Sequence, residues 1–90
     1  MSITVEIPPP LREHVAGLLS VPATGDTVAA VLADLARLHP AIEAKLFNAG
    51  KLRPHVNVLV NNEDIRYLDD LDTPTPEGSI VSLIPAVAGG

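Results

Sequence analysis

The residues with the most distinctive chemistry are the last two, Gly89 and Gly90. They have no side chains to shield the final carboxylate, and glycine adopts backbone angles that are closed to other residues. Such a segment can extend into a narrow slot that any Cβ atom would obstruct. We therefore expect the chemistry of this chain at the free carboxyl group of Gly90, with Gly89 keeping the approach to it open.

Four residues precede those glycines, and we predict that they contact a partner: Pro85, Ala86, Val87 and Ala88. Pro85 ends the last predicted strand, because proline cannot donate a hydrogen bond to a strand ladder. The three small residues after it either dock in extended form, by pairing with a partner strand, or serve as a plain linker. The sequence leaves both interpretations open.

The other side chains offer no second reactive group. The chain has no cysteine, which excludes disulfides, thiolate metal sites and a thiol nucleophile. His14, His39 and His55 are scattered, and no acidic ligand accompanies them at the spacing of a metal site. We predict no metal site and no cofactor bound by this chain.

The net charge of −5 is unevenly distributed. Residues 1–60 carry five acids and five bases, whereas residues 61–90 carry six acids and one base. Nucleic acid is therefore an unsuitable partner, since phosphate binding needs a basic face. The acids at 63–72 either face a basic protein surface or maintain solubility. With no bilayer-spanning run and no secretory signal, we expect a cytoplasmic protein that is monomeric when free.

Ninety residues make one domain, which we place at 1–85, followed by a flexible tail at 86–90. Its core must be aliphatic, because the chain has one Phe, one Tyr and no Trp. Alternation of polar and apolar residues predicts strands at 2–7 and 56–60. A run that is apolar at nearly every position, 80–84, is typical of a strand covered on both faces near the middle of a sheet.

Weaker patterns predict two more strands. One covers about 17–21, with Leu19 and Val21 facing inward, and Pro22 closes it. The other is a short edge strand at 65–67.

Helical spacing predicts one main amphipathic helix at about 27–39, capped by Asp26 or Thr27. Pro40 disfavours a helical residue before it and can begin a short second helix, at about 41–47. The apolar stripe of the main helix consists of Val28, Val31, Leu32, Leu35 and Leu38. The fold class is therefore α+β, with a mixed sheet of four or five strands and the main helix packed on one face. We expect the last strand beside the first.

In its length, element order and Gly-Gly end, the chain resembles the ubiquitin-like β-grasp family. Its segment 77–90 has a turn, a strand, a proline and Val-Ala-Gly-Gly, and is similar to the C-terminus of the MoaD/ThiS sulfur carriers. Within that family it most resembles the CysO type, the sulfur carrier of cysteine biosynthesis. The other segments that fit this type are 24–27, 51–52, 56–57, 60–61 and 63–64.

This resemblance implies a reaction at Gly90. An E1-like enzyme would adenylate the carboxylate with ATP, and a sulfur donor would then displace AMP and leave a thiocarboxylate. In the CysO type the sulfur goes to an acceptor held by a PLP-dependent cysteine synthase, and a zinc-dependent, JAMM-type protease frees the product. The partners supply the catalytic groups, so such a chain is a co-substrate and not an enzyme.

Other functions remain open beside this one. The same Gly-Gly chemistry serves the small subunit of a molybdopterin synthase and the thiazole pathway of thiamine. A different class of function is a ubiquitin-like modifier joined to lysines, or a plain interaction module. The match along 24–27 and 51–64 favours the CysO type.

Overall fold

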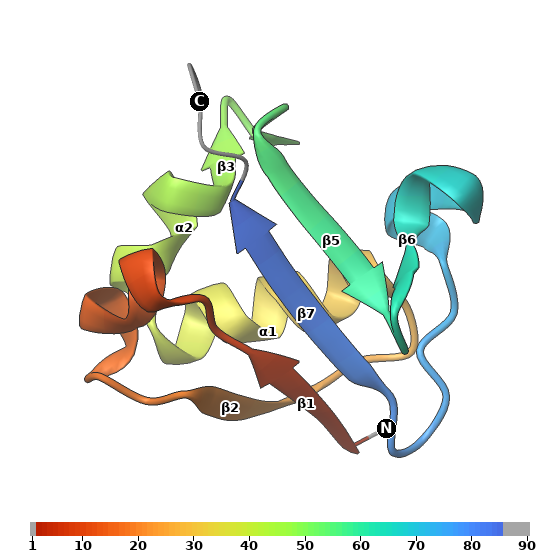
Figure 1. Ribbon diagram of the computed structural model, residues 1–90, viewed down its shortest axis with the longest axis horizontal. Coiled ribbons are helices and arrows are strands. Elements are labelled where there is room, and N and C mark those ends of the chain that lie inside the picture. Colours follow the sequence, from red (N-terminus) through yellow and green to blue (C-terminus); the bar gives the residue numbers. More distant parts are fainter. Residues whose placement is uncertain (1, 86–90) are drawn as a thin grey trace.

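A mixed sheet of five strands forms one layer of the protein, in the order β2-β1-β7-β5-β6. The computed structural model describes residues 2–85, apart from the side chain of Pro85. The strands are β1 Ser2–Glu6, β2 Ser20–Thr24, β5 Val56–Val60, β6 Glu63–Asp64 and β7 Ile80–Pro85. β7 lies between β1, to which it is parallel, and β5, to which it is antiparallel (Figure 1). The prediction that the last strand lies beside the first and in the middle of the sheet is confirmed.

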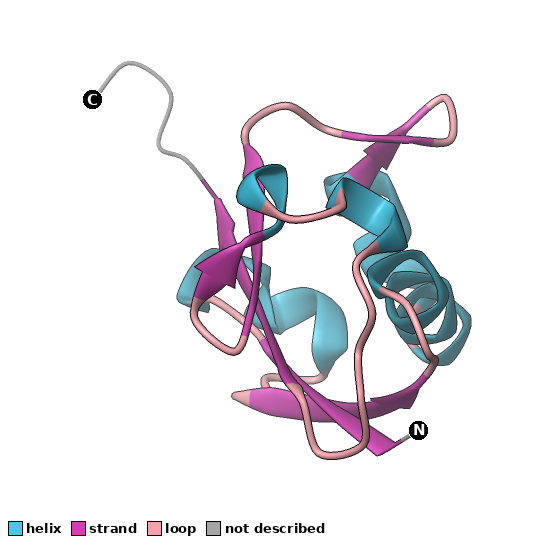
Figure 2. Cartoon of the chain, turned by 90° about the vertical axis from the view of Figure 1, so that its right-hand side faces the viewer, coloured by secondary structure: helices cyan, strands magenta, loops and turns pink. Residues whose placement is uncertain are grey.

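The second layer is helical. The α-helices are α1 Val28–Leu38 and α2 Pro40–Leu46, and the 3-10 helices are η1 Pro9–Val15, η2 Ile65–Tyr67 and η3 Asp70–Asp72. A small hairpin of β3 Phe47–Asn48 and β4 Lys51–Leu52 follows α2. α1 crosses behind the sheet in Figure 1 and is seen nearly end-on beside it in Figure 2. This is the predicted α+β arrangement.

α1 begins where a capping residue meets an apolar repeat. The Thr27 hydroxyl oxygen accepts a hydrogen bond from the Ala30 N–H at 3.2 Å, which satisfies one orphan donor of the first turn. Pro40 then begins α2 directly after the C-cap residue His39. The predicted helices at 27–39 and 41–47 are each within one residue of the observed ends. The buried side chains of the two helices are Val28, Val31, Leu32, Leu35, Ile42 and Leu46.

The core between α1 and the sheet is aliphatic, as predicted. Alternate residues of each strand point into it, because successive side chains of a strand lie on opposite faces. Ile3 and Val5 of β1 are buried, and so are the three valines of β5, Val56, Val58 and Val60. The predicted strand at 56–60 is confirmed, and the predicted strand at 2–7 is one residue longer than β1.

β2 begins and ends later than the predicted strand at 17–21. Val21 is buried as expected, but Leu19 is 66% exposed and Pro22 lies inside the strand. Thr24, two residues after Pro22, donates its N–H to Asp34 and not to β1. Because N–H groups alternate in direction along a strand, the nitrogen of Pro22 also faces away from β1. An edge strand tolerates proline at such a position, since no ladder bond is lost.

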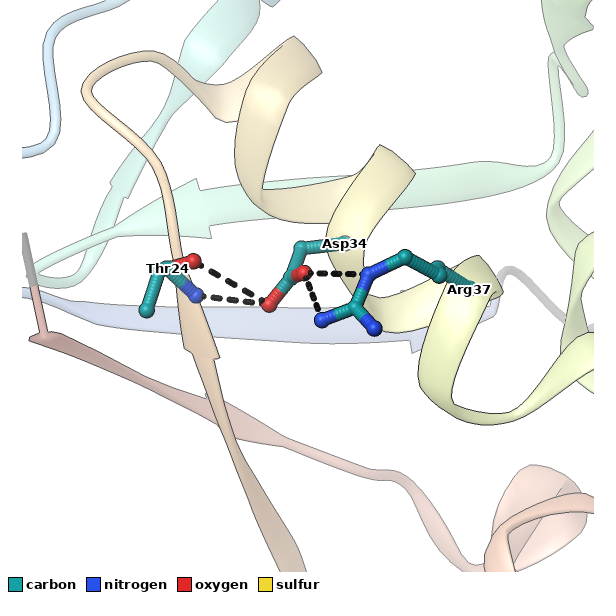
Figure 3. Close-up of polar contacts among 3 residues, drawn as sticks. All are labelled: Thr24, Asp34 and Arg37. Atoms are coloured by element: carbon teal, nitrogen blue, oxygen red, sulfur yellow. Dashed lines mark hydrogen bonds and ion pairs between the residues drawn. The ribbon is translucent and has the colours of Figure 1, made fainter.

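Asp34 of α1 fastens this edge strand to the helix (Figure 3). Its carboxylate accepts the backbone N–H of Thr24 at 2.9 Å and the Nη2 of Arg37 at 2.7 Å. The hydrogen bond from Thr24, followed by that from Arg37, lowers the pKa of Asp34 below its usual 3.8. The contact also occupies an edge N–H that would otherwise be open to a further strand.

The predicted edge strand at 65–67 is wrong. Those residues form η2, and the edge strand is β6, which pairs with Leu59 and Val60 of β5. Asn61 and Asn62 have positive φ angles of 50° and 73°, so a two-residue turn returns the chain at once. The Asp64 carboxylate then accepts the N–H of Arg66 at 2.9 Å, which caps the 3-10 turn.

The prediction that the last strand is covered on both faces is also wrong. Val81 and Leu83 are buried on the α1 side, but Ile80 and Ile84 are 42% and 46% exposed on the other side. Leu38, the last residue of α1, is 43% exposed, so the buried stripe of α1 stops before it. The sheet therefore has one covered face and one face that presents apolar side chains.

Candidate functional site

The carboxyl end of β7 determines where the chain leaves the sheet toward the two glycines. β1 pairs with β7 at residues 80–82, whereas β5 pairs with it at residues 81–85. The last pair of that register joins Val56 and Pro85. The last residues of β7 thus pair with β5 alone. Since β7 is the middle strand of the sheet, this pairing fixes the position of its carboxyl end.

The predicted site residues lie almost entirely beyond this point. Ala86, Val87, Ala88, Gly89 and Gly90 are outside the described residues, and their roles stay predictions. Pro85 is described as the last residue of β7. Its predicted contact with a partner stays a prediction as well, and so does the domain boundary after residue 85.

A groove of about 670 Å³ lies on the outer face of the sheet, next to the end of β7. Its apolar lining includes Leu19, Leu59 and Ile84. On its polar side, the Ser82 hydroxyl donates a hydrogen bond to a carboxylate oxygen of Glu6 at 2.8 Å. A groove that combines apolar and polar side chains in this way can serve as a protein contact surface.

The pattern of residues 80–84 does not by itself predict this surface, because its apolar residues belong to two opposite faces of the strand. Ser82 lies at the centre of the run and shares its face with Ile80 and Ile84, since residues two apart point the same way. A lone polar residue at the centre of an apolar strand was the available signal for an exposed face. Glu6 and Leu19 reach the groove only through the tertiary arrangement.

The buried polar side chains of residues 2–85 donate hydrogen bonds to backbone carbonyls and so support the fold. Thr75 donates its hydroxyl to the Gly25 carbonyl at 3.0 Å, and Ser79 donates to the Pro76 carbonyl at 2.7 Å. Within the described residues, no three His, Cys, Asp or Glu side chains come together as metal ligands. Over the same residues, no helix has the length and apolar character needed to cross a membrane.

Comparison with known proteins gives full-length matches. A family model described as the ThiS family matches residues 5–90, from β1 through the two glycines. The chain is 44% identical to the sulfur carrier protein CysO of Mycobacterium tuberculosis over 93 residues, which cover 100% of both proteins.

Solved structures agree with this match. A chain of the Amycolatopsis orientalis BexX/CysO complex superposes with a TM-score of 0.90 at 41% identity, covering 98% of this chain and 99% of that one. SAMP1 of Haloferax volcanii, a small archaeal modifier protein, superposes with a TM-score of 0.86 at 34% identity, covering 100% of both. The predicted β-grasp fold and the predicted likeness to the CysO type are confirmed.

Proposed function

The chain belongs to the ThiS family, and from this premise we propose that it is a sulfur carrier that other enzymes load and unload. The observation that supports this most directly is the 44% identity to a protein named as a sulfur carrier, over the whole of both chains. The role of the chain in the reaction is that of a protein co-substrate.

The proposed reaction takes place at the carboxyl group of Gly90. A carboxylate is a poor electrophile, so an E1-like enzyme first converts it to an acyl adenylate, with ATP as the AMP donor and pyrophosphate as the leaving group. A donor that supplies sulfur at the oxidation level of hydrosulfide (HS⁻) then attacks the acyl carbon, so that no separate reductant is needed. The bond to AMP breaks, a carbon–sulfur bond forms, and the chain is left with a terminal thiocarboxylate.

Cysteine biosynthesis is the proposed destination of the sulfur. In this pathway a PLP-dependent cysteine synthase holds the acceptor, and a zinc-dependent, JAMM-type protease releases the product from the carrier. The support for this step is the 44% identity to CysO over the full length of both chains. The BexX/CysO complex is a structure of a related carrier with a partner protein, which is consistent with loading by partner enzymes.

The described geometry is consistent with this role. The end of β7 is positioned by strand pairing, so a partner that binds the body of the protein has a fixed orientation relative to Pro85. The groove lined by Leu19, Leu59 and Ile84 lies next to that end and gives a partner an apolar surface to hold. A rigid body of this kind lowers the entropic cost of presenting a short segment to a slot.

Intact mass spectrometry of the protein purified from its own cells tests the proposal. We expect a fraction that is heavier by one exchange of oxygen for sulfur, located at the C-terminus by fragmentation. If the protein carries only an unmodified carboxylate under sulfur-replete and sulfur-limited growth alike, the sulfur-carrier function is wrong.

Removal of Gly90 gives a second test. We expect the shortened chain to keep its melting temperature, because the core lies within residues 3–83, and to lose ATP–pyrophosphate exchange with the activating enzyme. Addition of one residue after Gly90 should have the same effect. Exchange at the normal rate with either variant would contradict the assignment of Gly90.

A protein modifier is the second candidate function, and the likeness to SAMP1 favours it. The same activated carboxyl group would then form an amide bond with a lysine of another protein. Conjugates of higher mass that carry this chain, detected in cells and absent for the variant without Gly90, would support this function.

A further inference from the structure

Half of the Lys and Arg residues of this acidic protein lie in one short segment of the chain. Three of its six Lys and Arg residues, Lys45, Lys51 and Arg53, lie within nine residues of one another in sequence, and His55 follows. Between residues 35 and 62 the only acid is Glu43. By contrast, Arg37 and Arg66 are each paired with an aspartate at 2.7 Å.

The fold brings most of these basic side chains together. Lys45, Arg53 and His55 line one shallow pocket of about 290 Å³. Arg53 stabilises this arrangement, because its Nε donates to the Ala44 carbonyl at 2.9 Å at the end of α2. Lys51 lies on β4 and is exposed. We call Lys45, Lys51, Arg53 and His55 the basic end.

Arg53 also faces acidic neighbours. It lines a second cleft with Asp64 and Asp70, and a third with Glu43. No ion pair joins it to these acids within the described residues. The two lysines are therefore the clearest carriers of net positive charge at this end.

A series of backbone contacts places the basic end beside the carboxyl end of β7. The N–H of Arg53 donates to the Leu46 carbonyl at 2.8 Å, and the N–H of Val56 donates to the Arg53 carbonyl at 3.0 Å. Val56 in turn pairs with Pro85, the last residue of β7. The last turn of α2, the turn at 53–56 and the end of β7 are thus consecutive neighbours.

The length of the remaining chain limits how far away a partner can stay. Five residues follow Pro85, and they span at most roughly 18 Å when fully extended. A partner that encloses the last glycines must therefore bring the rim of its slot close to the surfaces that flank the end of β7. One such surface is the apolar groove, and the other is the basic end.

We infer that the basic end is a docking surface for an acidic protein surface, located on the partner at the mouth of the slot that receives Gly89 and Gly90. This inference rests on the proposed function. Cations on an otherwise acidic molecule orient it during approach, since the carrier is attracted with its C-terminal end foremost and repelled in other orientations. Nucleic acid fits less well, because the rest of the surface is acidic and few phosphates are within reach of this patch.

The test measures ATP–pyrophosphate exchange by the E1-like enzyme of the same genome, with the carrier as the varied substrate. The variant Lys45→Gln/Lys51→Gln should raise the KM for the carrier about three- to tenfold at low salt and leave kcat unchanged, because charges at the rim of an interface act mainly on association. The difference from wild type should shrink at high salt as the charges are screened.

Two glutamates give matched controls. Glu43→Gln removes the one acid of the 35–62 stretch and should lower KM, whereas Glu13→Gln makes the same change on η1 and should have no effect. Equal effects of the two would mean that only net charge matters, and the inference would be wrong. An unchanged KM for the lysine variant, with its melting temperature preserved, would overturn it as well.

Two other outcomes are distinguishable from these. If short duplex DNA inhibits exchange with the wild type but not with the lysine variant, the basic end binds nucleic acid and the inference is wrong. If the wild-type carrier supports no exchange at all, the proposed function itself fails and the docking surface fails with it.

Discussion

Gly25 occupies the turn between β2 and α1, and the space there excludes any side chain. A Cβ atom at this position would lie 2.6 Å from the backbone nitrogen of Val31 and 2.8 Å from the carbonyl carbon of Ala30. Both are backbone atoms of a helix, so they cannot move aside cheaply. The close approach of β2 to the start of α1 therefore depends on this residue.

We predict that Gly25→Ala destabilises the fold by about 3 kcal/mol or more, since the added methyl group forces the helix away. Gly17→Ala is the matched control. Gly17 has a φ of 76° with nothing within 4 Å of an added Cβ, so only backbone strain of about 1 kcal/mol is expected. Urea unfolding compares the two variants, and equal losses would contradict the role given to the contact with α1.

Asp34 gives a prediction about pH at the same scale. The hydrogen bond from the Thr24 N–H lowers the pKa of Asp34 in the folded protein below 3.8. A group with a lowered folded pKa contributes stability above its unfolded pKa, and this contribution is lost as the pH falls through the folded value. Asp34→Asn should therefore melt at a lower temperature than wild type near neutral pH.

The same comparison should be repeated as the pH falls below 3.8, where the gap between the two melting temperatures should narrow and then close once the pH passes the lowered folded pKa. A gap that stays constant through the acid range would show that the charge of Asp34 does not contribute. The hydrogen bonds from Thr24 and Arg37 would then stabilise the fold equally well with a neutral side chain at position 34.

At the scale of single elements, α1 shows what local patterns can and cannot predict. Its cap at Thr27 and its repeat of apolar residues lie within a few positions of one another, so the helix follows from sequence. The position at which its buried stripe ends does not follow from the sequence. Leu38 continues the repeat but is 43% exposed, whereas Leu35 is fully buried.

Truncation of Leu35 and truncation of Leu38 should reduce the stability of the protein by different amounts. Leu35→Ala leaves a cavity under the sheet and should cost about 2–5 kcal/mol. Leu38→Ala should cost less than about 1 kcal/mol, because the side chain already contacts solvent. Chemical denaturation of both variants checks this, and a large loss for Leu38→Ala would mean that the stripe extends to the end of α1 as the sequence indicated.

The molecule as a whole has a sheet with two unlike faces. One face packs on α1, and the other presents Ile80 and Ile84 beside the groove that includes Leu19 and Leu59. The basic end lies next to the same end of β7. Two surfaces of different chemistry thus flank the point where the chain leaves the sheet.

Neighbouring residues of β7 provide a test of this division. Leu83→Asp should prevent folding, because it buries a carboxylate without a partner in the core. Ile84→Asp should change stability by less than about 1 kcal/mol and should weaken activation by the partner enzyme. Circular dichroism and ATP–pyrophosphate exchange distinguish the two, and an unfolded Ile84→Asp protein would contradict the assignment of its face.

Several properties followed from the sequence alone: the helices, the strands at 2–7 and 56–60, the aliphatic core, and the family that the Gly-Gly end indicates. Each depends on residues close together along the chain, such as a cap and the repeat that follows it. Only the tertiary structure decided that Pro22 lies inside an edge strand, that Ile84 is exposed, and that Lys45 and His55 line the same pocket. Whether a face is covered, and which charges become neighbours, depends on segments that arrive from distant parts of the chain, and no local pattern contains that information.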